Sequence, residues 1–228
     1  GHHLLRDLLE NFLSDKNVMH INGISNENIG KNFHIHFLNI GNPFPHPRTD
    51  KIDLNILDIK ILKKKIYEEL KIFNKEILYY DGSLPYGYTN RIINFPNYIK
   101  LYEILNDILE FKIIYLRRNI IDCAKSIFRR KFETNPLNAS EIALKSFFVA
   151  HHTFHTLKKK IPFVEINYDK IVGGDKDCFG NLKNLLNLKD DFFDEKYEII
   201  KKKEYPDNSP EMQLMEKYLS YYLFLNNN

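Results

Sequence analysis

The chain has 228 residues, with 33 Lys and Arg against 30 Asp and Glu and a formal net charge of +3. Its hydrophobic share of 43% and charged share of 28% are those of an ordinary globular domain with its own core, which excludes wholesale disorder. The near balance of charges excludes a dedicated nucleic-acid binder.

Cysteine content and hydropathy limit the cellular locations expected for the protein. Cys123 and Cys178 are too few for a disulfide framework or a four-cysteine metal site, and we expect both thiols to be reduced. No apolar run approaches the about 20 residues of a membrane span, and no signal-peptide pattern opens the chain. We therefore expect a cytoplasmic location, with no membrane span and no nucleic-acid partner.

Helices and short apolar strands alternate along the chain. In the first half we expect a helix over 4–13, a loop over 15–31, a strand over 33–38, a helix over 55–73, a strand over 76–80, a turn over 81–87 and a helix over 98–109. In the second half we expect strands over 112–116 and 163–167, and helices over 121–132, 139–157, after 173–174 and over 211–225.

This alternation predicts one α/β domain spanning 1–228, with a mainly parallel sheet covered by helices on both faces. The two strands of the second half are expected to be buried on both sides. Asn138, with Glu141 three residues later, predicts a capping box at the start of the long helix.

A cation follows the strand predicted over 112–116. In an open α/β sheet, ligands bind beyond the carboxyl ends of the strands, and Arg118 falls at such an end. Its guanidinium can fork onto a phosphate, and the hydroxyl of Ser126, in the following helix, can hydrogen-bond the same anion. The structural alternative is that Arg118 only pairs with Asp122 at the helix start.

The residues around Arg118 form the pattern Tyr-Leu-x-Arg-Asn-x-x-Asp-x-x-x-Ser, filled by Tyr115, Leu116, Arg118, Asn119, Asp122 and Ser126. This pattern resembles the 3′-phosphate motif of sulfotransferases, which use 3′-phosphoadenosine 5′-phosphosulfate (PAPS) and leave adenosine 3′,5′-bisphosphate as product. Ile120 stands where the family has proline. The resemblance implies that Arg118 and Ser126 hold the 3′-phosphate. It also implies a three-layer fold like that of P-loop NTPases, with a mainly parallel central sheet flanked by helices.

Further segments are similar to the same family. Residues 163–172 and the helix after them resemble its late strand, turn and helix, and Leu84-Pro85 lies near a Leu-Pro of cytosolic members. The opening Gly1-His2-His3 resembles the end of the 5′-phosphosulfate loop, where a helix N-terminus favours an anion. By this resemblance Gly1, His2 and His3 line the 5′ side, and the family's first strand and loop lysine are expected before Gly1.

Transfer of a sulfuryl group by in-line displacement requires a base that takes the proton of the acceptor. Asp81, at a predicted strand end, is the first candidate, and turn capping ahead of Gly82 is its alternative role. His34 and His36 share one face of a predicted strand and titrate in a useful range, although a solvated strand explains them as well.

A metal site is not expected. His151 and His155 lie four residues apart on a predicted helix, but no Glu follows in the metalloprotease pattern and no Cys lies nearby. The predicted function is therefore a PAPS-dependent sulfotransferase acting on a hydroxyl or amine of a small-molecule, sugar or peptide acceptor. A non-catalytic nucleotide-binding protein of the same family is the first alternative, and a P-loop nucleotide kinase the second.

Overall fold

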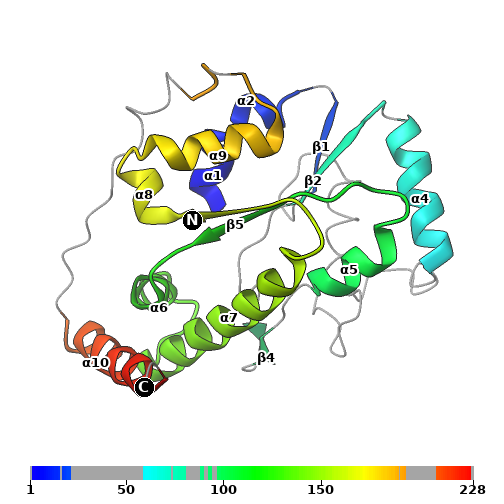
Figure 1. Ribbon diagram of the computed structural model, residues 1–228. Helices are drawn as coiled ribbons and strands as arrows, with labels where there is room; N and C mark the ends of the chain where they lie inside the picture. The colour runs from blue at the N-terminus through cyan, green and yellow to red at the C-terminus, as the bar shows by residue number, and fades with distance from the viewer. Residues whose placement is uncertain are drawn as a thin grey trace. The chain divides into compact units, whose positions relative to one another are not determined.

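The computed structural model describes residues 2–15, 17–21, 59–72, 74–80, 88–89, 92–93, 97–189, 191–193 and 209–226 (Figure 1). The chain divides into two compact units, Gly1–Lys112 and Ile113–Asn228. A single domain over the whole chain stays a prediction.

The first unit contains both helices and strands. Its helices are α1 (His2–Leu8), α2 (Glu10–Leu13), α4 (Ile59–Ile72) and α5 (Tyr98–Leu105). Its strands are β1 (Val18–Ile21), β2 (Ile77–Tyr80), β3 (Tyr88–Thr89) and β4 (Ile92–Ile93). The helix predicted over 4–13 is divided at Leu9, whose φ of −94° and ψ of 11° depart from helical values.

Strand β1 corrects the loop predicted over 15–31. Its Val18, Met19 and Ile21 are buried, and it pairs in parallel with β2 from Val18 opposite Ile77 to Ile21 opposite Tyr80. The prediction was wrong here because a strand of four residues is stabilised by a partner that is distant in sequence, while the local composition is dominated by turn-forming residues.

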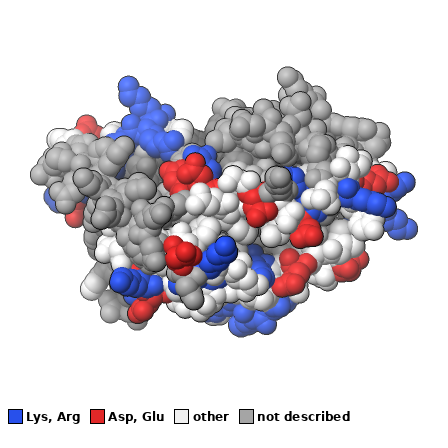
Figure 2. Space-filling model, turned by 90° about the horizontal axis from the view of Figure 1, so that it is seen from above, with Lys and Arg blue, Asp and Glu red and all other residues white. Residues whose placement is uncertain are grey.

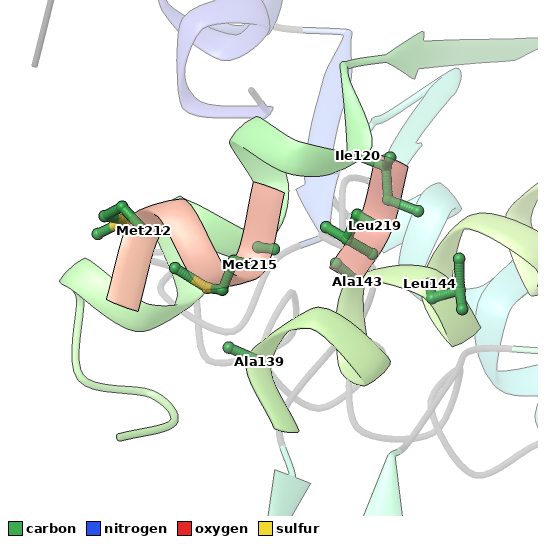
Figure 3. Close-up of a cluster of buried hydrophobic side chains, with 8 residues drawn as sticks. Ile120, Ala139, Ala143, Leu144, Met212, Met215 and Leu219 are labelled. Atoms are coloured by element: carbon green, nitrogen blue, oxygen red, sulfur yellow. The ribbon is translucent and has the colours of Figure 1, made fainter. Parts of the chain in front are cut away.

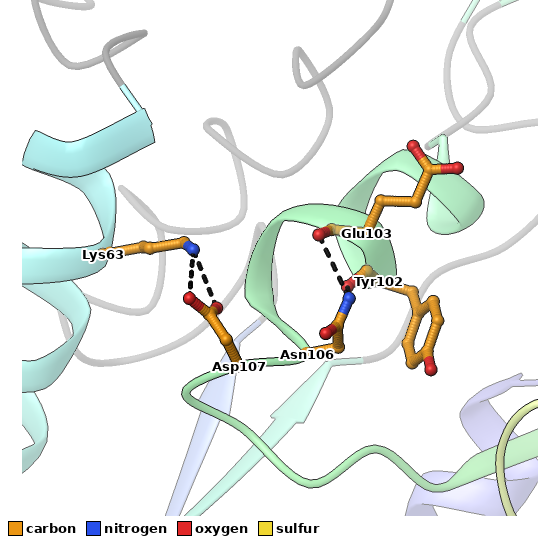
Figure 4. Close-up of polar contacts among 5 residues, drawn as sticks. All are labelled: Lys63, Tyr102, Glu103, Asn106 and Asp107. Carbon is orange, nitrogen blue, oxygen red and sulfur yellow. Dashed lines mark hydrogen bonds and ion pairs between the residues drawn. The ribbon is translucent and has the colours of Figure 1, made fainter.

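The core of the first unit joins the β1–β2 pair to α4 and α5. Its buried members are Met19, Ile21, Ile66, Leu101, Ile104 and Leu105. Just after α5, Asp107 accepts two hydrogen bonds from the Lys63 ammonium of α4, at 2.7 and 2.6 Å (Figure 4). An ion pair therefore adds a polar link beside this apolar contact.

The second unit is built on another parallel pair. Its strands are β5 (Ile113–Arg117) and β6 (Phe163–Asn167), and its helices are α6 (Ile120–Arg129), α7 (Pro136–Leu157), α8 (Tyr168–Val172), α9 (Lys176–Leu186) and α10 (Pro210–Asn226). The register runs from Ile113 opposite Phe163 to Arg117 opposite Asn167. These elements follow the sequence prediction in order and type, apart from the short helix α8 and the earlier start of α7.

Helices lie on both sides of the β5–β6 pair, with α7 on one side and α8 and α9 on the other (Figure 1). On the α7 side, Phe154 stacks on Tyr115 with ring centroids 4.4 Å apart. The strands themselves are less enclosed than predicted, because Ile166 is the buried residue of β6 while Glu165 and Asn167 are exposed. Burial on both faces was therefore wrong for this pair, which has a partly open polar side.

Helices α6, α7 and α10 enclose a second apolar cluster (Figure 3). Its buried members are Ile120, Ala124, Ala139, Ala143, Leu144, Met212, Met215 and Leu219. Small alanines on α6 and α7 leave room for the methionines and leucine of α10, so the last helix closes the core beneath α6.

The start of α7 corrects the predicted capping box. The N-cap is Asn135, whose side-chain oxygen accepts hydrogen bonds from the amides of Leu137 and Asn138 at 2.9 and 3.1 Å. Pro136 occupies the first helical turn, where its fixed φ is already helical and its missing N–H costs nothing. The N-cap therefore lies three residues before Asn138, the N-cap of the predicted box.

The described elements mix helices with short parallel strands, so the α/β class is confirmed. Within the described ranges, the strands form three separate pairs, of which β1–β2 and β5–β6 are parallel and β3–β4 is antiparallel. In that same part of the chain, no helix has the length and apolar character that crossing a membrane requires.

Candidate functional site

The carboxyl ends of β5 and β6 lie side by side. Arg117 is opposite Asn167 in the last register pair of these parallel strands, and Arg118 and Tyr168 come directly after them. Two residues that are distant in the sequence therefore meet at one edge of the strand pair, the edge where α/β proteins bind their ligands.

At this edge, the helix that follows each strand is capped by an asparagine. The side-chain oxygen of Asn119 accepts a hydrogen bond from the amide of Ile121 at 2.8 Å, and that of Asn167 accepts one from the amide of Asp169 at 2.8 Å. Both are N-caps with extended ψ angles of 132° and 125°. Arg118 is thereby fixed one residue before the cap of α6, beside a helix end whose dipole favours negative charge.

The guanidinium of Arg118 is held by an aromatic ring. Its Cζ lies 4.6 Å from the ring centroid of Tyr168, a cation–π contact. The closest carboxylate oxygen in an ion pair is Oδ2 of Asp122, 4.0 Å from the Arg118 Nε. That distance is too long for a hydrogen bond. The Nε is buried and has no hydrogen-bond partner, while the side chain as a whole is 24% exposed.

Asp122 and Ser126 share one face of α6. They are four residues apart, which places them on the same side of a helix, and Ser126 is half-buried. Ile120 and Ala124 occupy the opposite side of this amphipathic helix and are buried in the apolar cluster. Packing of the apolar side therefore fixes the direction of the polar side, on which Asp122 and Ser126 lie.

The neighbouring arginine has a different environment. Arg117 Nη1 donates to Glu165 Oε1 at 3.1 Å, and its side chain is 52% exposed. Two consecutive arginines thus differ: Arg117 has a hydrogen-bonded carboxylate across the strand pair, whereas Arg118 keeps a buried N–H with no hydrogen bond. Of these two residues, Arg118 is the one whose buried N–H lacks a hydrogen-bond acceptor.

Burial makes both thiols less acidic than a free cysteine. Burial raises the pKa of Cys123, and the positive charge of Arg118 only partly opposes this effect. Burial also raises the pKa of Cys178. Both cysteines are free and half-buried. Because the thiolate is the form that attacks an electrophile or binds a metal, a raised pKa makes both thiols less reactive.

Several predicted site residues lie outside the described part of the structure. Gly1, His34, His36 and Asp81 are among them. His2 and His3 belong to the backbone of α1, but their side chains are not described. Of the predicted site, the structure describes Arg118, which lies just before α6, and Ser126, which lies on α6. The predicted base and 5′ side stay predictions.

The paired histidines of α7 form a stack. The rings of His151 and His155 have centroids 5.8 Å apart and an angle of 22° between their planes. The charge of Lys158 is the main cause that lowers the pKa of His155. Within the described ranges, no three His, Cys, Asp or Glu side chains are grouped so that they could hold a metal ion.

Surface charge is mixed. On the face drawn in Figure 2, the described Lys and Arg side chains lie beside Asp and Glu side chains. The charge distribution on this face therefore does not mark an anion site, and we base the candidate site at Arg118 on its local contacts.

Sequence reasoning assigned no role to Tyr168, the ring on which Arg118 stacks. Its position directly after β6 is the feature that would have suggested this contact, once β6 was recognised as the parallel neighbour of β5. Pairing of the two strands, which the sequence does not state, was the missing step.

The chain matches no protein-family model, no curated protein and no solved structure in the three comparisons. A functional assignment therefore rests on the residues and contacts described above.

Proposed function

We propose that the chain is a PAPS-dependent sulfotransferase in which Arg118 and Ser126 bind the 3′-phosphate of the nucleotide. The observation that supports this proposal is the state of Arg118. Its guanidinium is held on Tyr168 at the carboxyl end of a parallel strand pair, with a buried Nε that makes no hydrogen bond. A phosphate accepts hydrogen bonds from such a cation more strongly than a neutral group does.

The residues present fit the 3′-phosphate half of PAPS. Arg118 would neutralise charge, the Ser126 hydroxyl would donate one hydrogen bond, and the N-terminal end of α6 would favour the anion through its dipole. When bound, PAPS would supply the sulfuryl group that is transferred to a hydroxyl or amine. The protein would orient the nucleotide through these contacts, and Tyr168 would keep Arg118 in place.

The finer parts of the proposal extend the described elements. We propose that the two parallel pairs belong to a three-layer fold like that of P-loop NTPases, with helices on both faces, as α7 and α9 are in the second unit. Gly1, His2 and His3 are proposed for the 5′ side, and Asp81, His34 or His36 for the base. A small molecule, sugar or peptide would be the acceptor. The two free thiols suit a cytoplasmic location.

The same observation supports a non-catalytic nucleotide-binding protein as a second candidate, because Arg118 binds an anion and does not react with it. The two candidates differ only in sulfuryl transfer. An assay of transfer from labelled PAPS to a panel of phenols, sugars and peptides distinguishes them.

The direct test is thermal unfolding with adenosine 3′,5′-bisphosphate. Saturation to about 100 times the dissociation constant stabilises a protein by about 2.7 kcal/mol, which corresponds to a rise in Tm of about 5–10 °C at this chain length. We expect this rise in the wild type and its loss in Arg118→Ala. Arg117→Ala is the matched control and should keep the rise, since its partner is Glu165.

Two results would contradict the proposal. An unchanged Tm of the wild type at millimolar bisphosphate would show that no nucleotide site is present. A larger rise with ATP than with the bisphosphate, independent of Arg118, would favour the nucleotide kinase instead.

A further inference from the structure

A carboxylate stands beside the cation that is proposed to bind phosphate. Oδ2 of Asp122 is 4.0 Å from Nε of Arg118, and the Asp122 side chain is 41% exposed. Asp122 also lies on the same face of α6 as Ser126. An anion that contacts both Arg118 and Ser126 therefore lies next to a negative charge.

This arrangement is unfavourable for a fully ionised ligand. Asp122 is too far from Nε to form a hydrogen bond with it, and the Nε has no other partner. The carboxylate therefore leaves Arg118 available while it repels incoming anions over a few ångströms. A ligand that carries a proton on one of its oxygens avoids this repulsion, because that O–H can donate to the carboxylate.

Phosphate and sulfate monoesters differ in this respect. A phosphate monoester has a second pKa of about 6, so its monoanion, with one O–H group, is populated at and below neutral pH. A sulfate monoester has no proton to donate in the pH range of folded proteins. Their size and tetrahedral shape are alike. A neighbouring carboxylate can therefore distinguish them by the proton, because only the phosphate has an O–H that donates a hydrogen bond to it.

We infer that Asp122 makes the Arg118 site selective for proton-carrying phosphate monoesters over sulfate monoesters. The inference rests on the proposed function, since it requires Arg118 to bind an anion. In the bound state, ionised phosphate oxygens accept hydrogen bonds from Arg118 and Ser126, and the phosphate O–H donates to Asp122. The site thereby distinguishes a nucleotide 3′-phosphate from a sulfated molecule of the same shape.

Asp169 is a second carboxylate close to Arg118. Asp169 follows Tyr168 on α8, and it acts electrostatically on Cys123 together with Arg118 and Asp122. Two further charged residues of these elements are paired: Arg117 with Glu165 across the strands, and Lys125 of α6 with Glu216 of α10 at 3.0 Å. Asp169 is therefore the matched control carboxylate, because it lies close by but forms no described ion pair with Arg118.

The test measures binding of adenosine 3′-phosphate and adenosine 3′-sulfate to the full chain by calorimetry at pH 5.5, 6.5 and 8.0. For the wild type we expect 3′-phosphate affinity to rise at least threefold from pH 8.0 to pH 5.5, and 3′-sulfate affinity to stay constant and weaker. Asp122→Asn should flatten the pH profile and raise 3′-sulfate affinity about threefold to tenfold. Asp169→Asn should change the ratio of the two affinities by less than twofold.

The outcomes separate the inference from the proposed function. Binding that depends on Arg118 but keeps its pH profile and its preference for phosphate in Asp122→Asn overturns the inference alone. An equal change in Asp169→Asn also overturns it, since a general charge effect would then explain the data. Failure of the wild type to bind either probe overturns both, and circular dichroism of each variant verifies that it is folded.

Discussion

Two ion pairs, one in each unit, differ in whether the cation forms a hydrogen bond with the carboxylate. In the first unit, Lys63 reaches from α4 to Asp107 and both carboxylate oxygens accept a hydrogen bond from the ammonium. In the second unit, Arg118 and Asp122 approach only to 4.0 Å, and the Arg118 Nε makes no hydrogen bond although it is buried. The first pair is complete, whereas the second leaves bonding capacity unused.

The difference indicates how to recognise a cation available to a ligand. A complete pair on an exposed surface links two elements and contributes modestly to stability. A buried cation that packs on a ring and lacks a hydrogen bond is stabilised by binding an anion, because the anion satisfies its N–H group. Arg118 meets the second description, and Lys63 meets the first.

The largest effect is expected from the apolar cluster of the second unit, against which α6 packs. Leu219→Ala, in the α6–α7–α10 cluster, should lower the free energy of unfolding by about 2–5 kcal/mol, because it removes a fully buried side chain and leaves a cavity. It should weaken nucleotide binding as well, since α6 carries Asp122 and Ser126. Urea-induced unfolding measures the change. Leu214→Ala, on the same helix at a 44% exposed position, is the control and should lower the free energy of unfolding by less than about 1 kcal/mol. Equal losses in the two variants would show that α10 does not pack as described.

An intermediate effect is expected from the asparagine caps, one in each unit. Asn119→Ala and Asn97→Ala each remove the N-cap of a helix, α6 and α5, and each should cost about 1 kcal/mol. Only Asn119→Ala should also lower affinity for adenosine 3′,5′-bisphosphate, because this cap fixes the chain next to Arg118. Calorimetric titration of both variants tests the contrast, and similar affinities would show that the cap has no part in the site.

The smallest effect is expected from the complete pair. The Lys63 ammonium lowers the pKa of Asp107, chiefly through the side-chain hydrogen bond. A lowered carboxyl pKa contributes stability that is present above the unfolded value of about 3.9 and is lost as the pH falls through the folded value. Lys63→Met should therefore lower the Tm at pH 7 by less than Asn97→Ala does, with no change in nucleotide binding. The difference from the wild type should begin to shrink as the pH falls to about 3.9 and should disappear once the pH is below the lowered pKa of Asp107. A difference that persists in acid would assign the effect to packing of the lysine stem.

Prediction from the sequence succeeded where the determinants were local. Helices α4, α6, α9 and α10 and strands β2, β5 and β6 were expected from periodicity and from apolar runs bounded by turn residues. It failed for β1, which depends on its partner β2, and for the start of α7, where Pro136 and Asn135 begin the helix earlier than the motif indicated. The first error comes from a strand partner that is distant in the sequence, and the second from a competing local signal, the Asn135 cap followed by Pro136.

For the candidate site, the sequence by itself determined that Arg118 follows a strand and that Ser126 lies on the next helix, because strand and helix periods fix which residues share an end or a face. Only the tertiary structure decided whether Arg118 was already satisfied. The side chain could have closed a hydrogen-bonded pair with Asp122, but the pairing of β5 with β6 brought in Tyr168, and the guanidinium stacks on that ring instead. Whether Arg118 stacks on Tyr168 or bonds to Asp122 depends on packing between segments that are far apart in the sequence, so a local sequence pattern cannot predict it.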